Sequence, residues 1–465
     1  MRMRKSRLER ELGSIVGKEN VTLHDDRKGE LISKVWSSAF RSLGLKTAPD
    51  AVVKPGNAME VVNLVNYAFD KGVPLIPRGG GTSALGGAVP VNGGVVIDTK
   101  RMDKIRIDED KKTLTAGAGV PWSRLNTKLE KKRLATGVAP LNLNSTLGGF
   151  ISTGGLGIGS LRHGSVGNQI INLEVVLPVG LKINTGYSKA YFSHGFGYSN
   201  SWLFTGAEGT LGVITEATLR VYPRDSLRVE VYGIQKDGNI FQRLSKFTQS
   251  SSLVSVVFLD RELAENELEI ETQGGALLLF TDEERKEDKF EEVGGATPIL
   301  EEDSKIRDRL QEVYGPEGYG GEVLLPLEGL PEVFKAVEKL SEKYSTRGLA
   351  GFMVDPYSIV LRLTCGEEES GLGRVTLMGD FVRMAMSLGG RPHGSGVWNS
   401  FWAEDVFGTN TLKLMRKIKE QIDPQNIMNP YKNINYPKSR LGVTVNPSLF
   451  RATTFLDKIF KRIKP

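Results

Sequence analysis

The sequence predicts an α+β protein with two domains, and three observations carry this prediction. The chain has 465 residues, which is too long for a single ordinary hydrophobic core. From about Ala51 to Pro223, helical and strand-like segments alternate and glycine is frequent. Beyond Pro223 glycine becomes rarer and charged helical segments follow, so we expect a domain boundary near residue 225.

The first domain is predicted to contain a helix that Asn57 caps and that ends at Gly72. Its apolar residues recur at helical spacing: Val61, Val62, Leu64, Val65, Ala68 and Phe69. The strand Val73–Ile76 then leads into a glycine-rich loop, and a helix opened by Pro121 runs to about Lys132. Further strands are predicted at Gly94–Asp98, Lys104–Asp108, Thr113–Ala118, Ile171–Leu177 and Leu211–Tyr222. Charged helices are predicted in the second domain, at Glu283–Glu292 and Glu301–Glu312.

The charge, the cysteine content and the apolar runs of the chain exclude several classes of protein. A formal charge of +6 is a mild excess that suits anionic small molecules, and no nucleic-acid partner is expected. The single cysteine, Cys365, excludes an intrachain disulfide and a thiolate iron–sulfur cluster within this chain, so a cytoplasmic location is expected. No run approaches the roughly 18 uninterrupted apolar residues of a membrane span, so we expect no integral membrane segment.

The loop Pro77–Ser83 contains three consecutive glycines, Gly79, Gly80 and Gly81. Glycine adopts positive φ without a Cβ penalty, so successive N–H groups can converge on one group of anionic oxygens, with hydroxyl donors from Thr82 and Ser83. This predicts a cradle for the pyrophosphate of a dinucleotide. A Rossmann loop is a poor alternative because Leu85–Pro90 is broken by glycines and closed by proline, which leaves no crossover helix. An ordinary surface loop remains an alternative for this segment taken alone.

Two further glycine-rich tracts follow, from Thr146 to Gly164 and from Gly206 to Thr215. Together with Pro77–Ser83 they resemble the FAD-binding domain of the vanillyl-alcohol oxidase superfamily, in which P-R-G-G-G-T, T-[IL]-G-G and G-[SA]-E-G-T-L-G-[IV]-[IV]-T occur in this order. The resemblance implies a two-domain FAD-binding fold with an α+β substrate (cap) domain. Within the superfamily the chain is most similar to the group of glycolate oxidase flavoprotein subunits, D-lactate dehydrogenases and alkyl-dihydroxyacetone-phosphate synthases.

The resemblance also divides the chain. It implies a FAD-binding domain over residues 1–225, a substrate (cap) domain over 226–400, a return to the flavin domain over 401–440 and a tail over 441–465. The segment Ile422–Pro430 is similar to the family's return motif. The residues expected to bind FAD are Arg78, Gly79, Gly80, Gly81, Thr82, Ser83, Pro140, Thr146, Gly148, Gly149, Ser152, Gly154, Gly212, Ile214 and Asn429.

The FAD is expected to be bound without a covalent link. Thr82 stands where the superfamily's attachment histidine would be, and Cys365 lies far from the position of an attachment cysteine. Because a covalently linked flavin has the higher redox potential, its absence favours a dehydrogenase over a strong oxidase.

The resemblance makes His393 the candidate catalytic base. It lies in Gly389–Gly396, which is similar to the family's G-E-H-G-[IV]-G, and imidazole near neutrality can take the hydroxyl proton of an alcohol while the carbon-bound hydrogen leaves as hydride. A polar loop histidine without catalytic function is the alternative. His163 is expected to pack beside the flavin, His194 to lie near the pocket and His24 to lie on the surface.

Two departures from the family pattern affect the substrate site. Pro392 replaces the glutamate that binds metal in related hydroxyacid dehydrogenases, and Phe352–Leu361 lacks the family's histidine pair, so no metal site is expected. The family's carboxylate-binding arginine is also missing from Leu324–Glu328. Arg391 and Arg362 are the best substitutes for binding an anion, although each could equally be a structural salt-bridge partner.

These features predict an FAD-dependent dehydrogenase that oxidises a 2-hydroxyacid such as glycolate or D-lactate. Its electrons would pass to a quinone or to an iron–sulfur partner protein. Two alternatives stay open, an enzyme similar to alkyl-dihydroxyacetone-phosphate synthase or one oxidising an aldonolactone or a sugar alcohol. A flavin subunit that only relays electrons is a third.

The C-terminal segment Phe450–Pro465 carries a separate signal. It reads as a basic amphipathic helix, which could lie peripherally on the inner face of a membrane, dock on a partner subunit or pack on its own domain.

Overall fold

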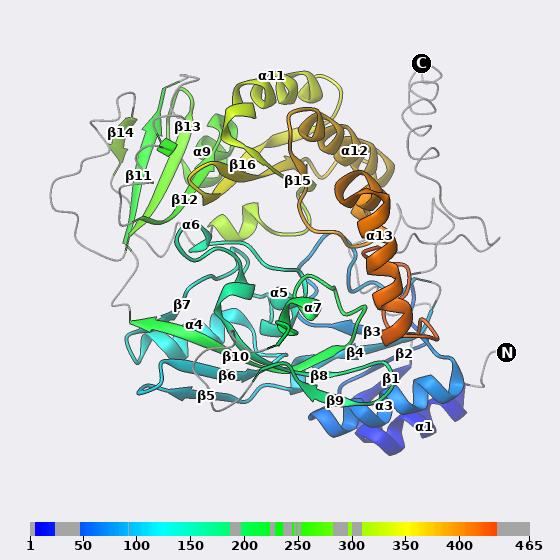
Figure 1. Ribbon diagram of the computed structural model, residues 1–465. Helices are drawn as coiled ribbons and strands as arrows, with labels where there is room; N and C mark the ends of the chain where they lie inside the picture. Colours follow the sequence, from blue (N-terminus) through cyan, green and yellow to red (C-terminus); the bar gives the residue numbers. More distant parts are fainter. Residues whose placement is uncertain are drawn as a thin grey trace, which may run out of the picture.

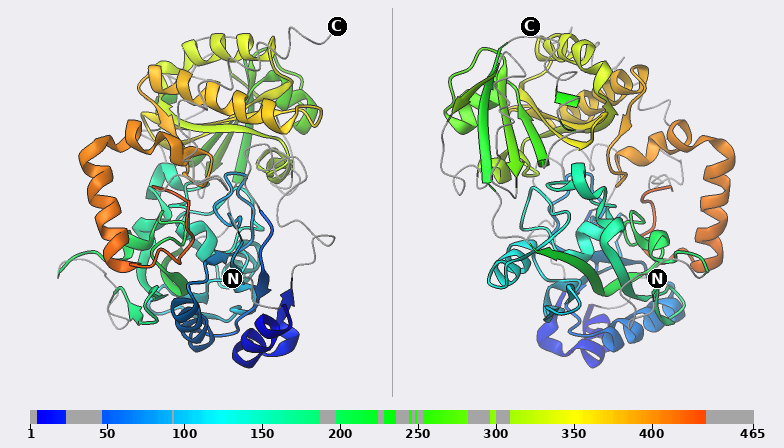
Figure 2. Two further views of the ribbon diagram at one scale, coloured as in Figure 1. Left: turned by 90° about the vertical axis from the view of Figure 1, so that its right-hand side faces the viewer. Right: turned by 60° about the vertical axis from the view of Figure 1, so that its left-hand side comes forward.

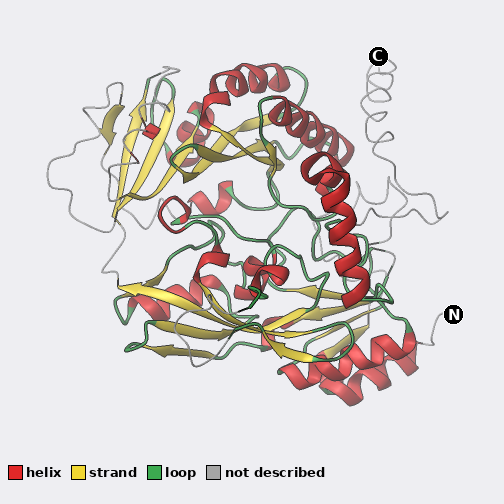
Figure 3. Cartoon of the chain, viewed as in Figure 1, coloured by secondary structure: helices red, strands yellow, loops and turns green. Residues whose placement is uncertain are grey.

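The computed structural model describes ten segments of the chain. They are residues 5–23, 47–91, 93–186, 197–223, 228–235, 244–245, 248, 253–281, 296–299 and 309–434. Figure 1 shows two bodies stacked on one another, the lower built from the first half of the chain and the upper from most of the second. Helices cover the outer faces of both bodies, and loops fill much of the layer between them (Figure 3). The predicted α+β class is therefore confirmed.

The first sheet of the lower body has four strands in the order β1-β2-β4-β3. Their bounds are β1 (Val21–Leu23), β2 (Ala51–Val53), β3 (Leu75–Arg78) and β4 (Val95–Asp98). The helices α1 (Lys5–Val16) and α3 (Ala58–Lys71) share one apolar core with this sheet. The predicted caps of α3 are confirmed, because the Asn57 side chain accepts from the N–H of Glu60 at 3.0 Å and Gly72 is left-handed.

Strand β3 begins two residues later than the predicted Val73. The N–H of Val73 donates to the carbonyl of Ala68 at 3.0 Å, so this residue still completes the C-terminal turn of α3. At its other end the strand extends to Arg78, where the glycine loop begins.

The second sheet has six strands in the order β5-β6-β10-β8-β9, with β7 also paired to β10. Their bounds are β5 (Ile105–Asp108), β6 (Thr113–Gly117), β7 (Leu134–Thr136), β8 (Ile170–Val176), β9 (Lys182–Asn184) and β10 (Val213–Pro223). Helices α4 (Trp122–Glu130), α5 (Leu147–Ser152) and α7 (Ser201–Phe204) share one apolar core with this sheet. The short helix α6 (Ser160–His163) contacts strands of the upper body instead. Strands β5, β6, β8 and β10 agree closely with the predicted ones, whereas β7 and β9 were not predicted.

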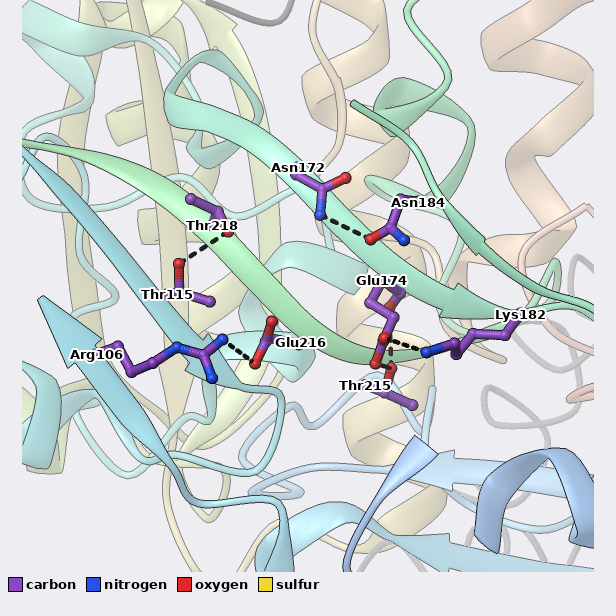
Figure 4. A network of polar contacts seen from close by, with 9 residues as sticks. All are labelled: Arg106, Thr115, Asn172, Glu174, Lys182, Asn184, Thr215, Glu216 and Thr218. Carbon is purple, nitrogen blue, oxygen red and sulfur yellow. Dashed lines mark hydrogen bonds and ion pairs between the residues drawn. The ribbon is translucent and has the colours of Figure 1, made fainter. Parts of the chain in front are cut away.

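One face of this sheet carries a network of polar pairs (Figure 4). Thr115 and Thr218 share a hydrogen bond of 3.0 Å across β6 and β10, and Glu174 accepts from Thr215 at 2.8 Å. On β10, Glu216 and Thr218 of this network alternate with Ala217 and Leu219, which are fully buried, and Thr215 lies at an irregularity in the pairing with β8. The period of two thus leaves one face polar and turns the other toward the core.

The third sheet has eight strands in the order β14-β11-β13-β12-β16-β17-β15-β18. Their bounds are β11 (Arg228–Ile234), β12 (Leu253–Leu259), β13 (Gly275–Thr281), β14 (Ala296–Ile299), β15 (Tyr319–Pro326), β16 (Thr346–Asp355), β17 (Ser358–Cys365) and β18 (Arg391–Pro392). Helices α11 (Leu330–Ser341) and α12 (Gly371–Ser387) pack on one face, and α9 (Arg261–Leu268) packs on the other. That second face also contacts Leu141 of the lower body.

Helix α13 (Ala403–Ile422) leads the chain from the upper body back to the lower one (Figure 2). Near its end the buried Lys419 forms an ion pair with Asp423 and also donates to the carbonyls of Thr210 and Met428, at 2.7 and 2.9 Å. Asp423 in turn accepts from the N–H groups of Ile427 and Met428, at 3.0 and 2.8 Å. The return motif is therefore a buried charge pair with its hydrogen bonds satisfied.

Several predictions concern residues outside the described segments. They are the helix Glu283–Glu292, the tail Phe450–Pro465, His24, His194 and the first eight residues of Glu301–Glu312, whose remainder lies in a helical segment, 309–313. In the part of the chain that the structure describes, no helix is long and apolar enough to cross a membrane.

The buried Lys419–Asp423 pair is expected to contribute to the stability of the fold. Lys419→Met leaves the Asp423 carboxylate buried without its ammonium, so we expect the free energy of unfolding to fall by about 3–5 kcal/mol. Urea denaturation measures the change. The matched control is Lys417→Met, because Lys417 is an exposed lysine on the same helix. If both variants lowered the free energy of unfolding by the same small amount, the account would be contradicted.

Candidate active site

A long pocket lies between the two bodies. From the lower body it is lined by all three glycine-rich tracts, and from the upper body by residues that include Tyr314, Glu322, Phe352, Arg362 and His393. The space measures about 1460 Å³ when the part open to solvent is counted. Segments more than 300 residues apart in the sequence thus share one cavity.

The first two glycine tracts lie directly against one another. A methyl group built on Gly79 would lie 2.1 Å from Oγ1 of Thr146, and one built on Gly80 would lie 2.4 Å from the carbonyl oxygen of Asn144. The hydroxyls of Thr82 and Ser145 share a hydrogen bond of 2.8 Å. These glycines are therefore needed for contact between the two loops as well as for exposing backbone to the pocket.

Most of the residues expected to bind FAD line this pocket: Arg78, Gly79, Gly80, Gly81, Thr82, Ser83, Pro140, Thr146, Gly148, Gly149, Ser152, Gly212 and Ile214. Gly154 and Asn429 are not among the lining residues. Gly154 packs against Gly206, whose Cα would lie 3.4 Å from a methyl group built there. Asn429 is fully buried, and its Nδ2 donates to the carbonyls of Gly87 and Glu208 at 2.8 and 2.6 Å, so it ties two loops of the lower body together.

A charged pair lies on the upper wall of the pocket. Glu322 on β15 and Arg362 on β17 face each other in the strand register, and their side chains form an ion pair of 3.0 Å. Arg362 also donates to the carbonyls of Tyr314 and Gly315. Its Nε is buried and has no hydrogen-bond partner among the described residues, and the same is true of the Tyr314 hydroxyl. This wall therefore holds two buried donors without a hydrogen-bond partner among the described residues.

His393 follows strand β18, and its N–H donates to the carbonyl of Glu322 at 3.0 Å. It is among the residues that line the pocket. Burial lowers the pKa of His393 below its ordinary value, the Glu322 carboxylate acts to raise it, and Arg391 acts to lower it further. The imidazole is therefore held in its neutral form at neutral pH, which is the form that can accept a proton.

The other candidate residues lie away from this wall. Arg391 is exposed, its guanidinium donates to the carbonyl of Pro392 at 3.3 Å, and it is not among the lining residues. His163 packs on the ring of Tyr222, with 4.5 Å between centroids. Cys365 is buried, and burial raises the pKa of its thiol to about 11. Within the described segments, no group of three or more His, Cys, Asp or Glu residues is placed to hold a metal ion.

The sequence prediction missed several pocket residues, among them Glu208, Glu322 and Tyr314. Glu208 could have been found, because it is the charged residue inside the third glycine tract. Glu322 and Tyr314 carry no comparable local signal, since their position depends on the register of β15 against β17.

The lining fits the FAD that the resemblance implies. Glycine backbone faces the pocket along three separate tracts, as an extended dinucleotide requires. The wall of the upper body then adds a histidine and two buried donors beyond the glycine tracts.

Comparisons with known proteins agree with this fit. The model of the FAD binding domain matches residues 49–186, and that of the C-terminal domain of FAD linked oxidases matches residues 260–433. The chain is 31% identical over 409 residues to the D-lactate dehydrogenase of Archaeoglobus fulgidus, covering 82% of this chain and 90% of that protein. It is 34% identical over 220 residues to the glycolate oxidase subunit GlcD of Bacillus subtilis, covering 47% of this chain and 45% of the subunit.

Among solved structures, p-cresol methylhydroxylase with substrate bound superposes with a TM-score of 0.77 at 16% identity, covering 95% of this chain and 97% of that one. At this identity the likeness concerns the fold, and it confirms the predicted vanillyl-alcohol-oxidase type. With both family models and a relative matched over nine-tenths of its length, the chain belongs to the family of FAD-linked oxidases and dehydrogenases and is an FAD-dependent oxidoreductase.

Proposed function

We propose that this chain is a dehydrogenase of a small 2-hydroxyacid, such as glycolate or D-lactate, with FAD bound non-covalently. The observation that carries the proposal is the meeting of a neutral histidine, an arginine Nε and a tyrosine hydroxyl in a pocket whose opposite wall is the glycine cradle. The names of two similar proteins, a D-lactate dehydrogenase and a glycolate oxidase subunit, support the substrate class.

The cofactor would be held by the lower body. The backbone of Gly79, Gly80 and Gly81 and the hydroxyls of Thr82 and Ser83 are suited to its pyrophosphate. Non-covalent binding is supported by the described lining, which contains one histidine and no cysteine. That histidine is His393, whose ring is needed as a base.

When bound, FAD accepts the hydrogen of the substrate carbon as a hydride. His393 accepts the hydroxyl proton on an unprotonated ring nitrogen, and its lowered pKa keeps that nitrogen free.

The substrate carboxylate would be bound by Arg362 and Tyr314. Arg362 and Tyr314 both line the pocket, and each has a buried donor, Nε–H or O–H, without a partner among the described residues. Hydrogen bonds from a charged donor to a carboxylate are among the strong ones. Because Glu322 already neutralises Arg362, the wall is not strongly cationic. This balance favours a substrate with a single carboxylate and disfavours a polyanion.

The electron acceptor is proposed to be a quinone or a partner protein. The basic amphipathic pattern of Phe450–Pro465 supports a peripheral position on an anionic membrane, where its lysines and arginine would add to apolar burial.

The substrate proposal is tested by mixing the purified yellow protein, without oxygen, with a panel of D- and L-hydroxyacids, aldonolactones and sugar alcohols. We expect glycolate or one enantiomer of lactate to bleach the flavin absorbance, because the hydrogen removed from carbon reduces the flavin. Acid precipitation of the same protein should release all FAD into the supernatant. Bleaching by aldonolactones or polyols only would contradict the hydroxyacid assignment, and flavin left on the precipitated chain would contradict non-covalent binding.

The role of His393 predicts both a rate and a pH dependence. His393→Ala should keep FAD yet slow substrate-driven flavin reduction by about 10²–10⁴-fold, the usual loss for a general base. In the unsubstituted protein the rate should rise with pH to a plateau, with a midpoint below the ordinary histidine pKa of about 6.5, because burial lowers the pKa of His393. Stopped-flow absorbance measures both.

His163→Ala is the matched control, since His163 packs on Tyr222 outside the lining, and it should keep the rate. An acid limb that persists unchanged in His393→Ala would assign the titration to another group.

A further inference from the structure

Glu208 is a buried carboxylate of the lower body that reaches the loop carrying His393. It lies in the third glycine tract, it is 8% exposed and its own φ is 50°. Its Oε1 and Oε2 accept from the N–H of Gly396 at 2.8 and 2.7 Å, and Oε1 accepts from the N–H of Ser395 at 3.3 Å. One side chain thus joins the two walls of the pocket.

The loop after His393 needs such support. Gly394 and Gly396 both have positive φ, of 71° and 54°, so the segment is built from residues with wide conformational freedom. The N–H of His393 is held from the upper body by Glu322, and the N–H groups of Ser395 and Gly396 are held from the lower body by Glu208. The imidazole therefore lies between two anchors that belong to different walls.

Glu208 is itself fixed in place. Its N–H donates to the carbonyl of Ser152 at 2.8 Å, and its carbonyl accepts from Nδ2 of Asn429 at 2.6 Å. Burial raises the pKa of Glu208, whereas the N–H of Gly396, the side chain and N–H of Ser395 and the ammonium of Lys432 act to lower it.

Burying a carboxylate is costly unless its hydrogen bonds are satisfied. Here they are satisfied by the N–H groups of Gly396 and Ser395 and by the Ser395 side chain, all in the His393 loop. A side chain required only for packing would not need a charge aimed at those two N–H groups.

We propose that Glu208 is a positioning residue that fixes His393 relative to the flavin cradle across the interface of the two bodies. The inference rests on the proposed role of His393 as the base. It assigns Glu208 no direct contact with the reacting atoms, so its effect on the rate should pass entirely through His393.

The first test measures the contact without any catalysis. In Glu208→Ala, hydrogen–deuterium exchange should become faster in peptides that cover residues 394–397, because the N–H groups of Ser395 and Gly396 lose their acceptor. Glu174→Gln is the matched control, a half-buried carboxylate of the same body that bonds Thr215 and Lys182 on the polar sheet face (Figure 4). Unchanged exchange in Glu208→Ala would overturn the anchor, whatever the reaction.

The second test measures flavin reduction in Glu208→Ala, His393→Ala and the double variant, each loaded with FAD. A displacement of about 1 Å costs on the order of 10²-fold in rate, so Glu208→Ala should slow reduction at saturating substrate by about that factor. The substrate concentration at half-maximal rate should change little. In the His393→Ala background the same substitution should add almost no further loss, because residues that act as a unit are not additive.

The outcomes distinguish the contact of Glu208 with the loop from its effect on the rate through His393. If the rate losses of the two single variants multiply in the double variant, positioning through His393 is overturned, even where amide exchange is faster. If His393→Ala itself reduces flavin at the normal rate, the proposed base fails, while the exchange result still decides the anchor. Should Glu208→Ala not fold with FAD, Glu208→Gln replaces it: this variant keeps the volume and one acceptor oxygen, and it should give smaller changes of the same sign in both measurements.

Discussion

The pocket depends on how closely the first two glycine tracts approach one another. Side chains at Gly79 or Gly80 would overlap Thr146 or the backbone of Asn144, so the two loops can form one wall only without them. The short helix α5 starts at this contact, where the Thr146 side chain accepts from the N–H of Gly149. Close backbone contact therefore shapes the wall and also leaves its amides facing the pocket.

The opposite wall of the pocket is held together by interactions of charged side chains, whereas the first wall depends on glycines. Glu322 and Arg362 compensate each other on neighbouring strands, and the carbonyl of Glu322 anchors His393. Glu208 and the Lys419–Asp423 pair then join this wall and the return helix to the lower body. Glu208 and Asp423 accept hydrogen bonds from backbone N–H groups, so the position of each charge is tied to the path of the chain.

Much of this arrangement could be predicted from the sequence. The features that could not be predicted depend on contacts between residues far apart in the chain. The caps of α3 at Asn57 and Gly72 and the order of the glycine tracts depend on short-range patterns, and they were predicted correctly. The pairing of Glu322 with Arg362 joins residues 40 positions apart through strand register, which no local pattern encodes. For the same reason sequence could not distinguish Arg362, in the lining, from the exposed Arg391.

The central claim is that this pocket breaks the C–H bond of a hydroxyacid while His393 takes the hydroxyl proton. The most direct measurement compares flavin bleaching, without oxygen and at saturating substrate, by the same hydroxyacid carrying hydrogen or deuterium on the hydroxyl-bearing carbon. The account predicts slower bleaching with deuterium, at the pH plateau where His393 is neutral. Equal rates for the two isotopologues would contradict it. So would bleaching by the corresponding acid without the hydroxyl group when the hydroxyacid itself causes none.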